Sequence, residues 1–182
     1  TARSSLICVA SEKKEGLHLL SGFTTGLELA ANSNIPVMIV PNDRKEFKPK
    51  GRLKVMYADD LAANSLGALC TAVELAYGLG EIDFYHVHVS GESKEEMASA
   101  GEKILDLMNM EQIDINPYFD INSLTDDVEN KFKKKMSERV GFAKSLLNSR
   151  DVEYIQQTKF GEVKDGMDEL VKEIDPDIVI FG

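Results

Sequence analysis

The sequence lacks three features that would assign it to a class at once: an excess of positive charge, a set of cysteines and a long apolar run. It has 21 Lys and Arg residues against 31 Asp and Glu residues, which gives a net charge of −10. A chain this acidic is not expected to bind nucleic acid or an anionic membrane surface through general electrostatics. No apolar run reaches the roughly 18 residues that a membrane-spanning helix requires.

Cysteine is scarce as well. The two cysteines, Cys8 and Cys70, both lie in apolar segments. This usage is typical of buried thiols in a reducing compartment rather than of a disulfide framework. Because the sequence also shows no charged and apolar leader, we expect a cytoplasmic protein. Hydrophobic residues make up 43% of the 182 residues, enough for one α/β domain or for one domain and part of another.

The clearest pattern lies between residues 53 and 89. Leu53 to Ala58 is continuously apolar, as in a strand covered on both faces. Asp59 and Asp60 end this strand, and residues 66–77 then show apolar positions at helical spacing. A second strand is expected over residues 83–89. Strand, helix and strand of this length predict a right-handed crossover in a parallel sheet.

Weaker patterns extend this prediction to the rest of the chain. Further strands are expected over residues 5–10, 35–40, 152–158 and 177–182, and further helices over 17–31, 94–109, 126–148 and 164–174. The inner stripe of the long helix is predicted to be Val128, Phe132, Met136, Val140, Ala143 and Leu147. Its lysine-rich outer face, which includes residues 131 and 133–135, is interpreted as a solvated face, with a phosphate or partner patch as the alternative.

The order of five segments resembles the universal stress protein family in its tandem form. The segments are LKVMYAD (53–59), NSLGALCTAVELA (64–76), FYHVHV (84–89), KFGEVKDGMDELVKEIDPDIVIFG (159–182) and GLHLLSGFTTGLELAANSNIPVMIVP (16–41). The resemblance implies an α/β fold with an open parallel five-stranded sheet of order 3-2-1-4-5 and helices on both faces.

The resemblance also implies a domain organisation. Residues 1–41 correspond to the C-terminal strand-helix-strand part of a first domain, and residues 53–182 to a second domain that lacks its closing helix and strand. The charged stretch 42–52 is the predicted linker. Residues 1–41 could complete the same sheet or a partner's sheet, or the chain could be a fragment of a longer tandem protein. The apolar strand Ile35–Val40 should not stay bare, so we expect a homodimer or an intramolecular tandem pair through it.

A ligand site is expected at the carboxyl ends of the strands, where parallel sheets bind ligands. Family members that bind ATP use an acid after the first strand, a valine backbone after the second, and a glycine loop that leads into the last helix. By position the acid is Asp59, with Ala58 beside it, and the valine is Val89. The resemblance places Gly22 and Thr24 in the glycine loop of the first domain copy. It places Gly182 at the first glycine of the loop in the second domain copy.

The loop departs from the family pattern. The first two glycines are missing from residues 10–16, Phe23 stands where a hydroxyl is expected, and Glu12 and Glu15 would repel a triphosphate. Only Gly22 matches cleanly. We therefore expect no ATP at the N-terminal loop and no certain cofactor, with ATP or AMP as the alternative.

Other interpretations of the polar residues stay open at this point. Asp59 and Asp60 could bind a ligand, or could form turns and cap the following helix. His86 and His88 share one face of a strand and could bind a metal. No third ligand is evident nearby, so packed and hydrogen-bonded histidines are favoured and no metal is expected. Neither a phosphate-binding loop with Gly-Lys-Ser/Thr nor a Gly-x-Ser-x-Gly motif is present, so no enzyme is expected.

These observations lead to one preferred function and two alternatives. The preferred function is a non-enzymatic stress-response or regulatory protein that acts by self-association and partner binding. The first alternative is an adenine-nucleotide switch with weak ATPase activity, built on Asp59 and Val89. The second is a cytoplasmic regulatory domain of a transporter.

Overall fold

The computed structural model describes residues 6–11, 28–29, 32–33, 35–41, 51–96, 99 and 121–181 of the chain. The chain divides into two compact units, Thr1–Lys50 and Gly51–Gly182. The division falls inside the stretch that the sequence predicts to be a linker.

The smaller unit contains a two-stranded parallel sheet. Its strands are β1 (Ile7–Ser11) and β2 (Val37–Pro41), in a register that runs from Ile7 opposite Val37 to Ser11 opposite Pro41. Both predicted strands are confirmed, with bounds shifted by one or two residues. Of the helix predicted over 17–31, the described residues Glu28 and Leu29 are helical, and most of the rest lies outside the described residues.

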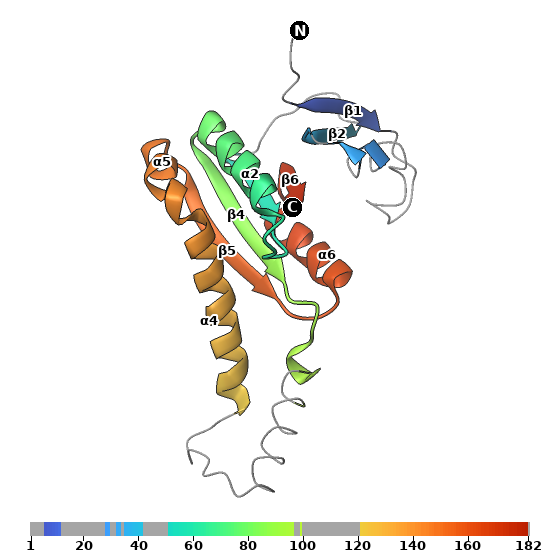
Figure 1. Cartoon of the computed structure of the whole chain (residues 1–182), viewed down its shortest axis with the longest axis vertical. Helices are drawn as coiled ribbons and strands as arrows, with labels where there is room; N and C mark the ends of the chain where they lie inside the picture. Colours follow the sequence, from blue (N-terminus) through green and yellow to red (C-terminus); the bar gives the residue numbers. More distant parts are fainter. Residues whose placement is uncertain are drawn as a thin grey trace, which may run out of the picture. The chain divides into compact units, whose positions relative to one another are not determined.

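The larger unit is built on a four-stranded parallel sheet (Figure 1). Its strands are β3 (Leu53–Ala58), β4 (Ile82–Val89), β5 (Glu153–Lys159) and β6 (Ile178–Phe181). They lie in the order β5-β4-β3-β6, which corresponds to the first four places of the predicted 3-2-1-4-5 order.

The predicted single sheet of five strands needs a correction. The described residues form one sheet of four strands and another of two, and β2, the expected fifth strand, pairs with β1. One edge of β2 is therefore already bonded to its sequence neighbour. Among the described residues the other edge of β2 is unpaired.

Helices cover both faces of the four-stranded sheet. They are α2 (Leu66–Leu79), α4 (Ile121–Val140), the 3₁₀ turn η1 (Gly141–Ala143), α5 (Lys144–Ser149) and α6 (Val163–Ile174). Side chains alternate along β3: Val55 and Tyr57 are buried in one cluster with α2, η1 and α5, and Met56 is buried in the other cluster with α6. The sequence thus correctly predicts a strand that is buried on both sides.

The long helix predicted over 126–148 is present, but it begins earlier, at Ile121, and is interrupted. Gly141 begins the 3₁₀ turn that separates α4 from α5. The predicted inner stripe is confirmed, with its last four members buried and Val128 and Phe132 half-buried. Of the helix predicted over 94–109, the described residues 94–96 and 99 are helical, and the remainder lies outside the described residues.

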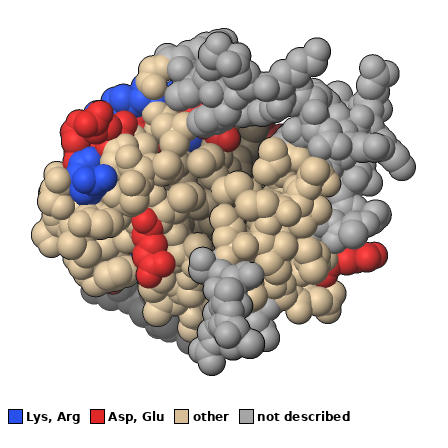
Figure 2. Space-filling model, turned by 90° about the horizontal axis from the view of Figure 1, so that it is seen from above, with Lys and Arg blue, Asp and Glu red and all other residues tan. Residues whose placement is uncertain are grey.

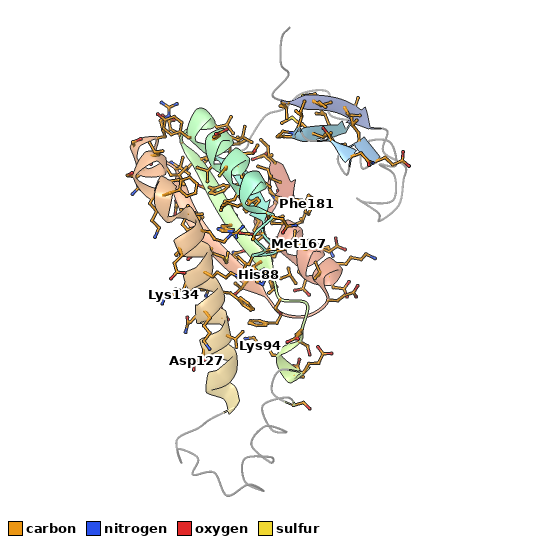
Figure 3. All side chains as sticks on the ribbon, in the orientation of Figure 1. His88, Lys94, Asp127, Lys134, Met167 and Phe181 are labelled. Carbon is orange, nitrogen blue, oxygen red and sulfur yellow. The ribbon has the colours of Figure 1, made fainter. Side chains whose placement is uncertain are left out.

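The lysine-rich face of α4 points away from the sheet. Figure 3 shows Lys134 on the outer side of the helix, and its side chain is 78% exposed. Lys134 and Lys133 form ion pairs at helical spacing with Glu138 and Glu129, as expected of a solvated face. In the view of Figure 2 the described surface is mostly uncharged, with acidic and basic side chains in small groups. Among the residues searched, no helix is long and apolar enough to cross a membrane.

Candidate functional site

The Asp59 carboxylate is the centre of a buried polar cluster at the carboxyl end of β3. Asp59 is only 3% exposed. Its Oδ1 accepts hydrogen bonds from the Leu61 amide at 2.9 Å and from Ser65 Oγ at 3.0 Å. Its Oδ2 accepts from His86 Nε2 at 2.9 Å. Protein donors therefore already occupy both carboxylate oxygens.

Arg139 closes this cluster from α4. Its Nε lies 2.8 Å from Asp59 Oδ2 as an ion pair, and its Nη2 donates to Asp59 Oδ1 at 3.2 Å and to Ser65 Oγ at 2.8 Å. Its Nη1 donates to the carbonyl of Ala62 at 3.0 Å. The Arg139 side chain is 13% exposed. One guanidinium thus holds both the carboxylate and the turn that follows it.

A chain of hydrogen bonds extends from the carboxylate through His86. His86 Nδ1 lies 2.8 Å from Tyr154 Oη, and Gln156 Nε2 donates both to Tyr154 Oη at 3.2 Å and to the Lys133 carbonyl at 2.8 Å. Because the Asp59 carboxylate only accepts, His86 Nε2 carries a proton. Tyr154 Oη and His86 Nδ1 share the next hydrogen bond. Hydrogen bonds thus connect Gln156, Tyr154, His86 and Asp59 in one chain.

The surroundings shift the acidity of the cluster members. Burial by itself would raise the pKa of the Asp59 carboxyl, but hydrogen bonds from His86, the Leu61 amide and Ser65 outweigh burial and lower the pKa to about 2. Burial and the nearby Asp59 charge raise the pKa of Tyr57 to about 12. Burial also raises the pKa of Tyr154. The cluster therefore holds one anion and neutral phenols at pH 7.

The acidic pair after β3 forms successive turns. Asp59 Oδ1 accepts from the amide of Leu61, and Asp60 Oδ1 accepts from the amide of Ala62 at 2.8 Å, which is the bonding of Asx-turns. Leu61 adopts a left-handed conformation with φ of 60°, uncommon for a residue with a branched side chain. Helix α2 begins only after Ser65. The turn-making interpretation is confirmed, whereas neither acid is the N-cap of α2.

The two strand histidines are packed and bonded as the sequence favours. His88 Nδ1 donates to the backbone carbonyl of Asp59 at 2.8 Å, and its ring lies 4.6 Å from that of Phe132 on α4. Figure 3 shows His88 between α4 and the sheet. Burial lowers the pKa of His88, so its ring is neutral at pH 7. Among the residues searched, no group of three or more metal-binding side chains is found.

Val89 lies at the end of β4 with its side chain buried. It packs so closely against Gly166 of α6 that a Cβ atom added there would lie 2.7 Å from its Cγ1. The Ser90 amide donates to the Lys159 carbonyl at 3.0 Å, and Ser90 Oγ donates to the Glu92 carbonyl. Asp59 and Val89 are thus both at the carboxyl edge, as the sequence predicts, and Ala58 at the end of β3 is half-buried. The loop residues Gly22, Thr24 and Gly182 lie outside the described residues.

The sequence interpretation missed the partners of Asp59. Arg139 is 80 positions away in the sequence, and Tyr154 and Gln156 lie on another strand. One signal was available: Arg139 stands three residues after Met136, on the flank of the predicted inner stripe of α4. A basic residue on a buried flank needs an acidic partner, and Asp59 was the acid already singled out.

Comparisons with known proteins give two similar solved structures. One is "Universal stress protein UspA from Lactobacillus plantarum", with 14% identity, a TM-score of 0.47, and coverage of 73% of this chain and 79% of that chain. The other is a protein from the universal stress protein family from Burkholderia pseudomallei, with 17% identity, a TM-score of 0.43, and coverage of 74% and 84%. No protein-family model and no curated protein matches the sequence. At these identities the likeness concerns the fold and says nothing of a ligand.

Proposed function

We propose that the chain is a universal-stress-type regulatory protein that acts without catalysis, through self-association and partner binding. Membership of that family is part of the proposal. It is supported by the order of the sequence motifs and by the β5-β4-β3-β6 order of parallel strands.

The state of Asp59 is the observation that carries this proposal. A nucleotide-binding member of the family would offer the corresponding carboxylate to its ligand. Here Asp59 is 3% exposed, and its carboxylate is bonded by His86, Ser65 and Arg139. A ligand would have to displace the guanidinium and leave it without its anion, which is costly for a buried pair. The loop before residue 22, which lacks two glycines of the family pattern, also argues against a bound nucleotide.

Self-association is supported by the open strand edges. Val40 on β2 is 42% exposed and Phe181 on β6 is 62% exposed. In the part of the chain that the structure describes, β2 pairs with β1 alone and β6 with β3 alone. Unpaired edges with apolar side chains invite pairing with another chain. The strand Ile35–Val40 of the sequence prediction, of which β2 is the observed core, remains the proposed contact in a homodimer or tandem pair.

The first test is for bound nucleotide. Small molecules released from purified, denatured protein would be identified by mass spectrometry, and ATP and AMP would be titrated into the folded protein by calorimetry. We expect far less than one nucleotide per chain and no heat of binding. Nucleotide near one per chain would contradict the ligand-free proposal and favour the alternative of an adenine-nucleotide switch.

A variant then locates any nucleotide that is found. If the switch alternative holds and Asp59 contacts the ligand, Asp59→Ala should weaken binding by at least tenfold. The matched control is Asp60→Ala, because Asp60 is exposed and its carboxylate accepts the local amide of Ala62. Equal affinities in the three proteins would place the nucleotide elsewhere.

A further inference from the structure

The strand β5 forms the edge of the four-stranded sheet opposite to β6. Among the described residues it pairs only with β4, from Glu153 to Lys159. It is seven residues long and contains no proline. A strand of this length leaves a row of unpaired backbone groups on its outer side, which is a template for another strand.

The direction of these backbone groups follows from one hydrogen bond. The carbonyl of Lys159 accepts from the Ser90 amide at 3.0 Å, so the backbone of Lys159 faces β4. Backbone groups alternate in direction along a strand. The amides and carbonyls of Tyr154, Gln156 and Thr158 therefore point outward, at the open edge.

A groove runs along this edge. A cavity of about 230 Å³ is lined by four consecutive strand residues, 156–159, together with Glu129 and Lys133 of α4 and Glu173 of α6. Residues from both faces of the sheet can line one cavity only where the edge itself is open. Gln157 Oε1 and Thr158 Oγ1 are buried and have no hydrogen-bond partner among the described atoms. The lining of the groove is polar, which suits an extended backbone better than an apolar ligand.

The side chains of β5 are complementary to a second copy of themselves. Suppose that two copies of β5 pair antiparallel with Gln156 opposite Gln156. A residue that lies a given number of positions before Gln156 in one copy then faces the residue that lies the same number after Gln156 in the other. Glu153 of one copy then lies opposite Lys159 of the other, and the reverse pair repeats this contact. Both residues are on the same face of the strand, because they are separated by an even number of positions. Opposite charges placed in this way stabilise a strand pair, and like charges destabilise it.

We propose that two copies of this chain associate through β5, antiparallel and centred on Gln156, to form a continuous eight-stranded sheet. The backbone N–H and C=O of Gln156 bond those of Gln156 in the second copy. The backbone groups of Tyr154 in each copy bond those of Thr158 in the other, so about six hydrogen bonds join the chains. Glu153 and Lys159 occupy the pairs without backbone hydrogen bonds, where side chains approach most closely. A nearly neutral edge also suits the contact, since each chain carries a net charge of −10.

This inference rests on the proposed self-association and adds a second surface for it, in addition to the strand Ile35–Val40. The edge is not that of Ile35–Val40, which lies in the smaller unit. The Lys159 ammonium now lies 2.6 Å from Glu173 and 3.4 Å from Glu169. The Lys159 side chain lies on the same face of the strand as the Glu153 of a second copy would, so the two can meet without a change in the direction of Lys159.

The test is a charge-reversal series on the whole chain. Dissociation constants would be measured by sedimentation equilibrium for the wild type, for Glu153→Lys and for Glu153→Lys combined with Lys159→Glu. We expect Glu153→Lys to weaken the dimer by about tenfold or more, because it sets lysines against each other twice. The double variant should recover most of that loss. The control is Glu74→Lys, the same charge change at an exposed position on α2, which should leave the constant unchanged.

Amide exchange provides a second measurement that does not depend on a variant. In the wild type, the amides of Tyr154, Gln156 and Thr158 should exchange more slowly as the protein concentration rises through the dissociation constant. A chain that stays monomeric would overturn both this inference and the proposed self-association. A dimer that is insensitive to Glu153→Lys, without added protection in β5, would overturn the inference alone and leave another edge as the contact.

Discussion

At the scale of single residues, Asp59 and Arg139 join the turn after β3 to helix α4. The pair is almost fully removed from solvent, with side chains 0% and 13% exposed. A buried charge is tolerated when it is paired and hydrogen-bonded, and becomes costly when its partner is removed. The stability of the larger unit should therefore depend on Arg139 far more than on the other basic residues of α4.

Replacing Arg139 by methionine tests this dependence. Arg139→Met keeps the length of the side chain but leaves the Asp59 carboxylate without its ion pair, so the free energy of unfolding should fall by about 3 kcal/mol. Urea denaturation followed by circular dichroism measures the change. Lys134→Met on the same helix is the control, and because Lys134 is exposed its effect should stay within about 0.5 kcal/mol. Equal effects of the two variants would show that the pair has no structural role.

The depressed pKa of Asp59 predicts how stability responds to acid. The carboxyl titrates near its ordinary value of 3.8 in the unfolded chain and at about 2 in the folded protein. Above pH 3.8 both states are ionised and the stabilisation is fully present. It is lost as the pH falls from 3.8 through about 2, because the unfolded chain takes up the proton first.

The measurement is the free energy of unfolding between pH 5.5 and 2.5. Over this range the wild type should lose about 2 kcal/mol more than Asp59→Asn, which has no carboxyl at this position. Asp60→Asn is the matched control and should follow the wild type. If Asp59→Asn loses stability in parallel with the wild type, the lowered pKa is wrong.

Residue-scale features divide clearly between those the sequence predicts and those it does not. An acid directly after a buried strand is visible in the sequence and indicates the carboxyl edge of a parallel sheet. Whether that acid faces a ligand or a guanidinium depends on which helix lies over it. Arg139 is brought to Asp59 only by the packing of α4, and local sequence around Asp59 contains no sign of it.

At the scale of elements, the contact of β4 with α6 depends on a glycine. A Cβ atom at Gly166 would lie 2.7 Å from Cγ1 and 3.2 Å from Cγ2 of Val89. These distances are shorter than ordinary van der Waals contact, so the helix would have to move away from the strand. Such overpacking typically costs about 1–3 kcal/mol.

Gly166→Ala should therefore lower the free energy of unfolding by about 1–3 kcal/mol, measured in urea. Combining it with Val89→Ala should reduce its cost, because the clashing methyl groups are removed, and a double-mutant cycle measures this coupling. The control is Gly78→Ala on α2, where no atom lies within 4 Å of the added Cβ. That substitution should be neutral or stabilising by up to about 1 kcal/mol. A harmless Gly166→Ala would contradict the close approach.

Element bounds follow the sequence most closely at β3 and α6. The strand at residues 53–58 is predicted to the residue, and helix α6 to within one position. The break at residues 141–143 was not predicted. The apolar stripe of Met136, Val140, Ala143 and Leu147 continues through it, so the stripe alone does not show where the hydrogen bonding of the helix changes.

At the scale of the whole molecule, the larger unit has its own core. Both clusters of buried side chains in the described structure are drawn from residues 53–180. No member of either cluster comes from the described residues of Thr1–Lys50. The larger unit should therefore fold without the smaller one.

Deleting residues 1–50 tests this independence. The free energy of unfolding of the remaining chain, measured in urea, should match that of the larger unit in the full chain within about 0.5 kcal/mol. As the control, deleting residues 178–182 removes β6, its pairing with β3 and the contacts of Ile178 and Ile180 with the core, and should cost several times more. If removal of residues 1–50 is as damaging as removal of β6, the two units share a core.

The sequence by itself determined the parallel α/β class and the position of the carboxyl edge, which depend on local apolar patterns and on the handedness of crossovers. The order of the strands was implied only by the resemblance to the universal stress protein family. Only the tertiary structure decided that Asp59 is closed by Arg139, that β2 pairs with β1, and that β5, with opposite charges at its two ends, has a strand on one side only among the described residues. These depend on contacts between residues far apart in the sequence, where packing decides which groups meet.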